Sequence, residues 1–281
     1  MSIQLIAADL DGTILRSDKT VSARTEQAFR AVSAQGCLVV PSTGRLKKTI
    51  PEQVLGFPGV RFCVTSNGAS VLDLQTGGAV FTDLMTREQT ERVLSYLCPT
   101  GFLVEAYAGG NSYSERKALA GMIRMGPPEW LVDLTLQSQT FVDDLPAYVR
   151  EHGMRLEKIN LPYLPAGDRH RFACAFSSMP GFAVCSAYDT NLEINTASCS
   201  KGNALDHLCS RLGIPAAQAM AVGDGGNDVS MLRWAGLGVA MGNASRDALE
   251  AADAVTASND ADGVALALER YVLRPAGNPG L

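Results

Sequence analysis

Short apolar runs recur along this chain of 281 residues, and each one stops at a polar turn. The first is Ile3–Ala8, which leads into Asp9, Asp11 and Gly12. Others lie at Cys37–Val40, Phe62–Thr65, Ala219–Val222 and Leu237–Ala240. Helical patterns follow several of these runs, and this alternation is typical of a parallel sheet with helices on both faces. We therefore predict an α/β fold with a Rossmann-like, doubly wound parallel sheet as its core.

The alternation stops between residues 83 and 188. Scattered Gly and Pro turns separate strand-like pieces there, such as Phe102–Ala106, Leu134–Phe141 and Phe172–Phe176. The earlier pattern returns at Leu192–Asn195. The sequence thus predicts a core over residues 1–82 and 189–281, an inserted α+β cap domain over 83–188, and a frayed tail over 274–281.

Composition excludes several classes of function. The net charge of -5 offers no basic surface for nucleic acid, and no apolar run approaches the roughly 18 residues that span a bilayer. The N-terminus lacks the basic segment and apolar core of a signal peptide, so we expect a cytoplasmic protein without a membrane partner. The seven cysteines show no Cys-x-x-Cys spacing, which favours reduced, buried side chains over a zinc site.

Polar residues at the strand ends should meet, because the carboxyl ends of parallel strands share one edge of a sheet. They are Asp9, Asp11, Thr43, Lys201, Asp224, Asn227 and Asp228. Four carboxylates would repel one another there, and a set of oxygen ligands without His or Cys favours Mg²⁺. Mg²⁺ beside a hydroxyl and an ammonium suits phosphoryl transfer, in which an aspartate can be the nucleophile. No Gly-x-x-x-x-Gly-Lys-Ser/Thr loop is present, which argues against a nucleotide bound in the P-loop manner.

Four segments, in order, resemble the motifs of the haloacid dehalogenase (HAD) superfamily. They are Asp9-Leu-Asp-Gly-Thr13, Thr43-Gly-Arg45, Lys201-Gly202 and Gly223-Asp-Gly-Gly-Asn-Asp228. Two later segments, Met241-Gly-Asn-Ala244 and Asp262-Gly-Val264, are similar to segments of its Cof-type phosphatases, which form HAD subfamily IIB. The insertion between the second and third motifs has the position and approximate size of the cap in those enzymes.

The resemblance implies a role for each motif residue. Asp9 would attack phosphorus to form an aspartyl-phosphate, and Asp11 would protonate the leaving alcohol and then activate water. The substrate's phosphoryl group would be bound by Thr43, Gly44, Lys201 and Asn227. Mg²⁺ would be held by the Asp9 carboxylate, the Asp11 backbone carbonyl and Asp224, with Asp228 supporting the site. Asp11 also suits acid-base work because a carboxyl two residues from the nucleophile projects to the same side of an extended segment.

Other interpretations compete with these. Asp-x-Asp-Gly alone also occurs in turns and calcium loops, although the third ligand and terminal Glu of a calcium loop are missing here. Three secondary candidates have plain alternatives as well. Asn67-Gly68 could lie near the site but also fits a plain turn, and Arg45 could reach the substrate but also fits a surface role. The basic run Arg169–Arg171 could meet a substrate anion but also fits a solvated face.

The prediction is a Mg²⁺-dependent phosphatase acting on a small phosphomonoester such as a sugar phosphate. A phosphomutase with a similar cap would use the same nucleophile. A phosphosugar sensor without activity is disfavoured, because it would not need both Asp11 and Lys201.

Overall fold

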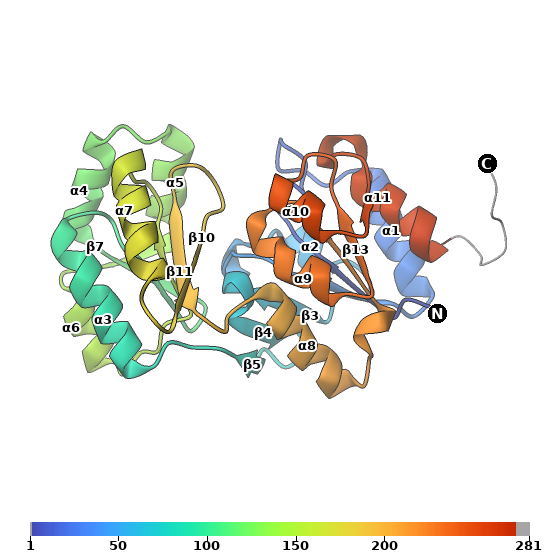
Figure 1. Ribbon diagram of the computed structural model, residues 1–281, viewed down its shortest axis with the longest axis horizontal. Helices are drawn as coiled ribbons and strands as arrows, with labels where there is room; N and C mark the ends of the chain where they lie inside the picture. The colour runs from blue at the N-terminus through green and yellow to red at the C-terminus, as the bar shows by residue number, and fades with distance from the viewer. Residues whose placement is uncertain (1, 274–281) are drawn as a thin grey trace. The chain divides into compact units, whose positions relative to one another are not determined.

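The computed structural model describes residues 2–273, so the tail predicted to fray, 274–281, lies outside the described residues. The chain divides into two compact units (Figure 1). The first contains the residues up to Gly44, Ile50–Phe81 and the residues from Ser200 onward, and the second contains Arg45–Thr49 and Thr82–Cys199. Within residues 2–273, no helix is both long and apolar enough to cross a membrane.

A five-stranded sheet forms the centre of the first unit, in the order β14-β13-β12-β1-β2. Its strands are β1 (Leu5–Ala8), β2 (Leu38–Pro41), β12 (Ala219–Gly223), β13 (Leu237–Ala240) and β14 (Ala254–Val255). Neighbouring strands run parallel, with Leu5 of β1 opposite both Ala219 and Leu38. The carboxyl ends of the strands therefore lie along one edge, as the alternating pattern predicts.

Helices cover both faces of this sheet. They are α1 (Ala23–Ala34), α2 (Glu52–Leu55), α8 (Lys201–Leu212), α9 (Val229–Trp234), α10 (Arg246–Ala251) and α11 (Gly263–Leu268). On one face, Ile6 of β1 belongs to a cluster with Phe29 of α1. On the other face, Leu5 belongs to a cluster with Leu205 of α8. Burial on both sides explains the uninterrupted apolar runs and confirms the doubly wound fold class.

A smaller sheet of β3 (Phe62–Thr65), β4 (Ser70–Asp73) and β5 (Ala79–Thr82) extends this architecture. Single parallel bridges, Val39 to Val60 and Ser42 to Val64, connect it with the segment of β2. The end of β3 thus lies beside the end of β2, which brings the residues after both strands to the same edge.

The second unit is built on a six-stranded sheet in the order β10-β11-β9-β6-β7-β8. The strands are β6 (Glu105–Ala108), β7 (Asn111–Glu115), β8 (Gln139–Val142), β9 (Lys158–Leu161), β10 (Phe182–Cys185) and β11 (Leu192–Thr196). The helices are α3 (Arg87–Leu97), α4 (Arg116–Arg124), α5 (Glu129–Ser138), α6 (Leu145–Glu151) and α7 (Ala166–Ser177). All pairings are antiparallel except that of β7 with β8.

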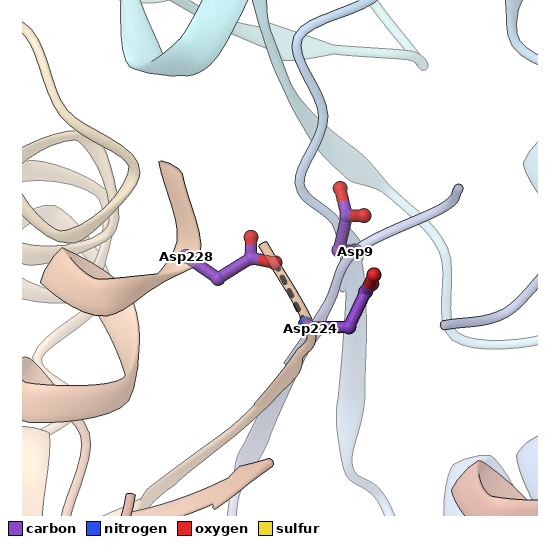
Figure 2. Close-up of side chains that lie close together, drawn as sticks. All are labelled: Asp9, Asp224 and Asp228. Carbon is purple, nitrogen blue, oxygen red and sulfur yellow. Dashed lines mark hydrogen bonds between the residues drawn. The ribbon is translucent and has the colours of Figure 1, made fainter. Parts of the chain in front are cut away.

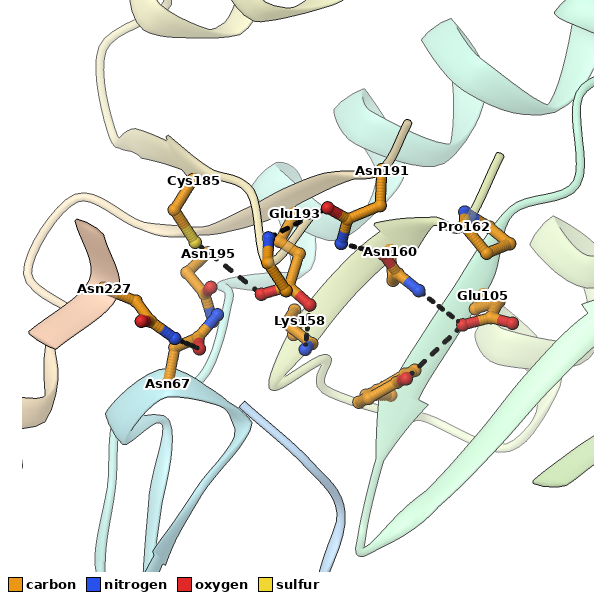
Figure 3. A network of polar contacts seen from close by, with 12 residues as sticks. Asn67, Glu105, Lys158, Asn160, Pro162, Cys185, Asn191, Glu193, Asn195 and Asn227 are labelled. Carbon is orange, nitrogen blue, oxygen red and sulfur yellow. Dashed lines mark hydrogen bonds and ion pairs between the residues drawn. The ribbon is translucent and has the colours of Figure 1, made fainter. Parts of the chain in front are cut away.

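The two faces of this second sheet differ in chemistry. Ile159 and Ile194 lie in an apolar cluster with Leu94 of α3, Val149 of α6 and Phe172 of α7. The alternate positions of the same strands are polar and form a network of hydrogen bonds and ion pairs (Figure 3). An antiparallel sheet with one apolar and one polar face shows a period of two in its sequence.

The structure corrects the predicted boundary at residue 188. The sequence pattern places residues 192–195 in the core, but strand β11 pairs with β9 and β10 of the second unit. The physical reason is visible in Leu-Glu-Ile-Asn-Thr: Leu192 and Ile194 are packed in the apolar cluster, whereas Glu193 lies on the polar face. This alternation belongs to a sheet with one polar face and not to a strand covered on both sides.

Two of the three predicted strands in this unit are also wrong. Phe172–Phe176 lies inside α7, where the two Phe side chains, four residues apart, share one buried helix face. Leu134–Phe141 contains the end of α5 and the start of β8. The third piece, Phe102–Ala106, reaches only the beginning of β6.

Candidate active site

The ends of β1 and β12 deliver a cluster of three carboxylates within the first unit. Asp9, Asp224 and Asp228 each offer an oxygen, and these oxygens lie within 4.8 Å of one another (Figure 2). Asp9 follows β1 and is only 7% exposed, and its backbone N–H donates to Val222 of β12. The predicted convergence of these carboxylates at one edge of the sheet is therefore observed.

Lys201 lies between two of these carboxylates. Its ammonium is fully buried and donates to Asp9 Oδ1 and to Asp228 Oδ1, each at 2.6 Å. Lys201 is the first residue of α8, and Ser200 caps this helix by accepting from the Asn203 backbone N–H. The buried cation therefore has two anionic partners, which account for its position at a helix end that the macrodipole disfavours for positive charge.

Gly202 allows this arrangement. A Cβ on Gly202 would collide with the backbone carbonyl of Ser230 in α9. The two helices α8 and α9 can thus approach closely at their N-terminal ends, where they carry Lys201 and Asp228 respectively. Replacement of Gly202 by any larger residue would separate these two side chains.

The loop after β12 is closed by Asp228. Its second oxygen, Oδ2, accepts hydrogen bonds from the backbone N–H groups of Asp224 and Gly225 at 2.9 and 2.8 Å. Asp228 therefore fixes the position of Asp224 in addition to binding Lys201. Asp224 accepts a further hydrogen bond of 2.6 Å from the Thr13 hydroxyl.

Burial and mutual repulsion dominate the electrostatics of this cluster. Desolvation raises the pKa of Asp9 well above its usual range, partly countered by Lys201, and Asp228 and Asp224 raise it further. Desolvation also raises the pKa of Asp224 to about 6. For Lys201, burial opposes the charged form, but Asp228 and Asp9 offset this effect and raise its pKa. Three carboxylates share one ammonium, and this excess of negative charge is the condition under which a bound cation stabilises a site.

The donor set of this cluster fits a hard divalent metal ion. All three side chains offer oxygen, and neither His nor Cys belongs to the group. Asp9 and Asp224 retain more free acceptor capacity than Asp228, whose two oxygens already accept from Lys201 and from two backbone N–H groups. The cluster could therefore hold a metal ion through Asp9 and Asp224, with Asp228 as the residue that orders the loop.

Asp11 lies beside this cluster but outside its group of three. Its carboxylate accepts from the ammonium of Lys19 at 2.9 Å, and both side chains are substantially exposed. Lys19 has a positive φ of 67°, which L-residues rarely adopt, so this turn is strained where it presents its ammonium to Asp11. Neither the contact of Lys19 with Asp11 nor that of Thr13 with Asp224 is expected from the sequence.

The remaining predicted residues follow β2, β3 and β12. Thr43 is buried, and its backbone joins the end of β2 to β3 by donating to Val64 and accepting from the Asn67 N–H. Gly44 is the last residue of its segment in the first unit. The amide of Asn227 donates to Asn67 Oδ1 at 3.2 Å, so the turn at Asn67-Gly68 is in contact with the loop after β12.

The secondary candidates with basic side chains belong to the second unit. Arg45 donates to the Thr49 carbonyl at 2.8 Å. Arg171 pairs with Asp168 one turn earlier in α7, and Arg169 contacts the Ser186 hydroxyl. The basic run therefore lies on a helix and has local partners.

Comparisons with known proteins identify the family of this chain. The family model of haloacid dehalogenase-like hydrolases matches residues 6–268. A phosphatase of Bacillus subtilis, YwpJ, is 31% identical over 94% of this chain and 98% of its own length. The 5-amino-6-(5-phospho-D-ribitylamino)uracil phosphatase YcsE of the same organism is 29% identical over 97% of each chain.

A solved structure of a haloacid dehalogenase-like hydrolase from B. subtilis superposes with a TM-score of 0.81 at 27% identity, covering 96% of this chain and 100% of that one. The match extends through both units, so the insertion belongs to the shared architecture. The chain therefore belongs to the haloacid dehalogenase-like hydrolases and is one of their Cof-type phosphatases.

Proposed function

We propose that this phosphatase hydrolyses small phosphomonoesters with the help of Mg²⁺ and through an aspartyl-phosphate on Asp9. The observation that carries the proposal is the position of Asp9 at the end of β1. Its carboxylate contacts the Lys201 ammonium at 2.6 Å and lies in a group of three carboxylates that could hold a metal ion. An oxygen nucleophile flanked by this ammonium and, when bound, by a metal ion would suit attack on a phosphoryl group, whose own oxygens are negative.

Mg²⁺ would be held by the Asp9 and Asp224 carboxylates and the backbone carbonyl of Asp11, with Asp228 supporting the site. When bound there, the ion would neutralise negative charge on the phosphoryl oxygens. Its preference for oxygen ligands agrees with the chemistry of the carboxylate group.

The chain's own residues would carry the two chemical steps. In the first, an Asp9 oxygen forms a bond to phosphorus, the bond to the leaving oxygen breaks, and Asp11 donates a proton to that oxygen. In the second, Asp11 takes a proton from water, which attacks the aspartyl-phosphate and returns Asp9 to its carboxylate form with release of inorganic phosphate. Thr43, Gly44, Lys201 and Asn227 would bind the phosphoryl oxygens throughout.

A sugar phosphate or related metabolite is the substrate class we propose. YcsE supports it, because the substrate in its name carries its phosphate on a ribityl chain. A leaving group with several hydroxyls is common to that compound and to sugar phosphates. Small-molecule partners and a cytoplasmic location complete the proposal.

The test is release of inorganic phosphate by the purified full chain from a panel of phosphomonoesters, with Mg²⁺ or with EDTA. We expect turnover that requires Mg²⁺ and that falls by about 10⁴-fold in Asp9→Asn, because the amide is a far weaker nucleophile. Asp206→Asn is the matched control, since Asp206 lies on α8 and binds the Trp234 indole. Turnover of Asp9→Asn at the wild-type rate would overturn the mechanism, and phosphoryl return to sugar in place of phosphate release would identify a mutase.

A further inference from the structure

Two segments late in the chain contact the loop that follows β1. We call residues 10–20 the β1 loop, since they contain Asp11, Gly12 and Lys19. The contacting residues are Asn243, after β13, and Asn259, Asp260 and Asp262, before α11. Both segments belong to the first unit and contain the Met241–Ala244 and Asp262–Val264 motifs, to which the catalytic steps give no role.

Asn243 uses both ends of its amide. Its Nδ2 donates to the Gly12 carbonyl at 2.9 Å, and its Oδ1 accepts from the Asn259 backbone N–H at 3.0 Å. The side chain of Asn259 in turn donates to the Leu15 carbonyl at 3.0 Å. Two backbone carbonyls of the β1 loop are therefore held by amides that are themselves connected.

The outer part of the β1 loop is held by charge. Arg16 pairs with Asp262 at 2.7 Å, and Ser17 donates from its backbone and its hydroxyl to Asp260 at 2.9 and 2.6 Å. These contacts are at least partly exposed and would contribute little stability by themselves. Together they restrict the position of the β1 loop, because they attach it to segments that lie more than 200 residues away in the sequence.

Within the β1 loop, the orientation of the Gly12 peptide has the largest effect on the carboxylates of the site. Gly12 has a φ of +82°, and a Cβ there would collide with the Asp224 carboxylate. The next residue, Thr13, donates its hydroxyl to the same carboxylate at 2.6 Å. A rotation of the Gly12 peptide would therefore displace Asp11 on one side and the Thr13 contact with Asp224 on the other.

We propose that Asn243 is a positioning residue, which fixes the Gly12 carbonyl and through it the orientation of Asp11 and Asp224. The amide of Asn243 donates to Gly12 and accepts from Asn259 at once. A carboxylate of the same size would keep the second hydrogen bond and replace the first by repulsion between two oxygens. The kinetic part of this inference rests on the proposed function, since it concerns the same Asp11.

The experiment compares Asn243→Asp and Asn243→Ala with Asn111→Asp in the full chain. Asn111 is a matched control because it is also exposed and donates to a glycine carbonyl, that of Gly109. With p-nitrophenyl phosphate and Mg²⁺, we expect kcat to fall 10- to 100-fold in both Asn243 variants, since a displacement of about 1 Å costs this much, while KM stays within about threefold. Asn111→Asp should keep the wild-type kcat.

Amide hydrogen exchange at Thr13, Ile14 and Leu15 gives a second readout that needs no turnover. We expect exchange at least 10-fold faster in Asn243→Asp than in Asn111→Asp, with thermal stability nearly equal in the two variants. An unchanged kcat in folded Asn243→Asp would overturn the inference. If the wild type shows no phosphatase activity, the proposed function fails independently of this inference. In that case, an unchanged rate of amide hydrogen exchange in Asn243→Asp would refute the restraint by Asn243.

Discussion

Each unit of this protein buries one lysine against a carboxylate, and the two lysines have different surroundings. Lys201 of the first unit contacts Asp9 and Asp228, with Asp224 in the same group. Lys158 of the second unit contacts Glu193 at 2.7 Å (Figure 3). Its ammonium also lies 4.7 Å from the centre of the Tyr107 ring. Both lysines are almost completely removed from solvent.

The difference lies in the balance of charge. Around Lys201 the carboxylates outnumber the ammonium, so the group could hold a further cation. Around Lys158, Glu193 forms an ion pair with the ammonium. The next carboxyl, Glu105, accepts from the Asn160 amide at 2.7 Å, and desolvation raises its pKa to about 7. The comparison teaches that burial of a lysine does not by itself mark an active site. Lys201 differs because it contacts a group of three carboxylates whose oxygens lie within 4.8 Å of one another and could hold a metal ion.

The largest expected effect that would test this contrast is on turnover. Lys201→Met should lower kcat/KM for p-nitrophenyl phosphate by at least about 10³-fold, because the phosphoryl group loses its buried cation. Steady-state kinetics in saturating Mg²⁺ measures it. A loss of less than about tenfold would mean that the carboxylate group works without the ammonium, and the contrast between the two lysines would disappear.

Lys158→Met should act on stability. We expect it to lower the free energy of unfolding by about 3 kcal/mol, because Glu193 would remain buried without its cation. Urea denaturation followed by circular dichroism measures this loss. The double variant Lys158→Met/Glu193→Gln should recover most of it, and a double variant as unstable as the single one would show that the cost is lost packing instead.

Mg²⁺ should stabilise the protein in a manner that depends on pH. Burial raises the pKa of Asp224 to about 6. The protonated side chain therefore stabilises the fold fully below 3.8, the pKa in the unfolded chain, and this stabilisation is lost as pH rises through about 6. Because Mg²⁺ competes with that proton, its effect should grow from pH 5 to pH 7. At 100 times its Kd it should reach about 2.7 kcal/mol, measured as a rise in Tm.

Asp224→Asn supplies the control for the effect of Mg²⁺. This variant should lose most of the rise in Tm at pH 7, whereas Glu105→Gln in the second unit should keep it. An equal rise in Tm in the wild type and Asp224→Asn would place the ion elsewhere.

The smallest expected effect is at Glu105. Its raised pKa means that the protonated form stabilises the fold below pH 4.5, and that this contribution is lost as pH rises through about 7. Glu105→Gln keeps the neutral form at every pH, so we expect it to be more stable than the wild type at pH 8 and equal to it at pH 4. Chemical denaturation at both pH values measures this, and an identical difference at the two would contradict the titration.

The carboxylate group could be predicted from sequence because parallel topology brings distant strand ends together without detailed knowledge of side chains. Asp9 and Asp224 are 215 positions apart in the numbering, yet each directly follows an apolar run. The fold class could be predicted for the same reason. Once the strands are parallel, the edge at which they end is determined.

The contributions of Lys19, Asn243 and Lys158 could not be predicted in this way. Lys19 contacts Asp11 from a turn in which its backbone adopts a positive φ, and no local sequence pattern predicts that turn. Asn243 contacts Gly12 because the loop after β13 brings the two residues together, and no sequence pattern predicts the course of that loop. Lys158 contacts Glu193 because β9 pairs with β11. The boundary near residue 188 was misplaced because a short strand of alternating residues was assigned to the wrong sheet.

Hydrogen bonds within the inserted unit hold the segments at which the chain enters and leaves it. The Thr196 hydroxyl of β11 donates to Asp83 at 2.7 Å, and Arg155 donates to the carbonyls of Leu84 and Met85 just after the entry. When the two ends of an inserted segment lie close together, the host domain needs to accommodate only a short distance between the two connection points. Evolution, or an engineer, can therefore exchange such an insert for another of different length while the host sheet keeps its connectivity, which offers a route by which one catalytic core acquires many substrates.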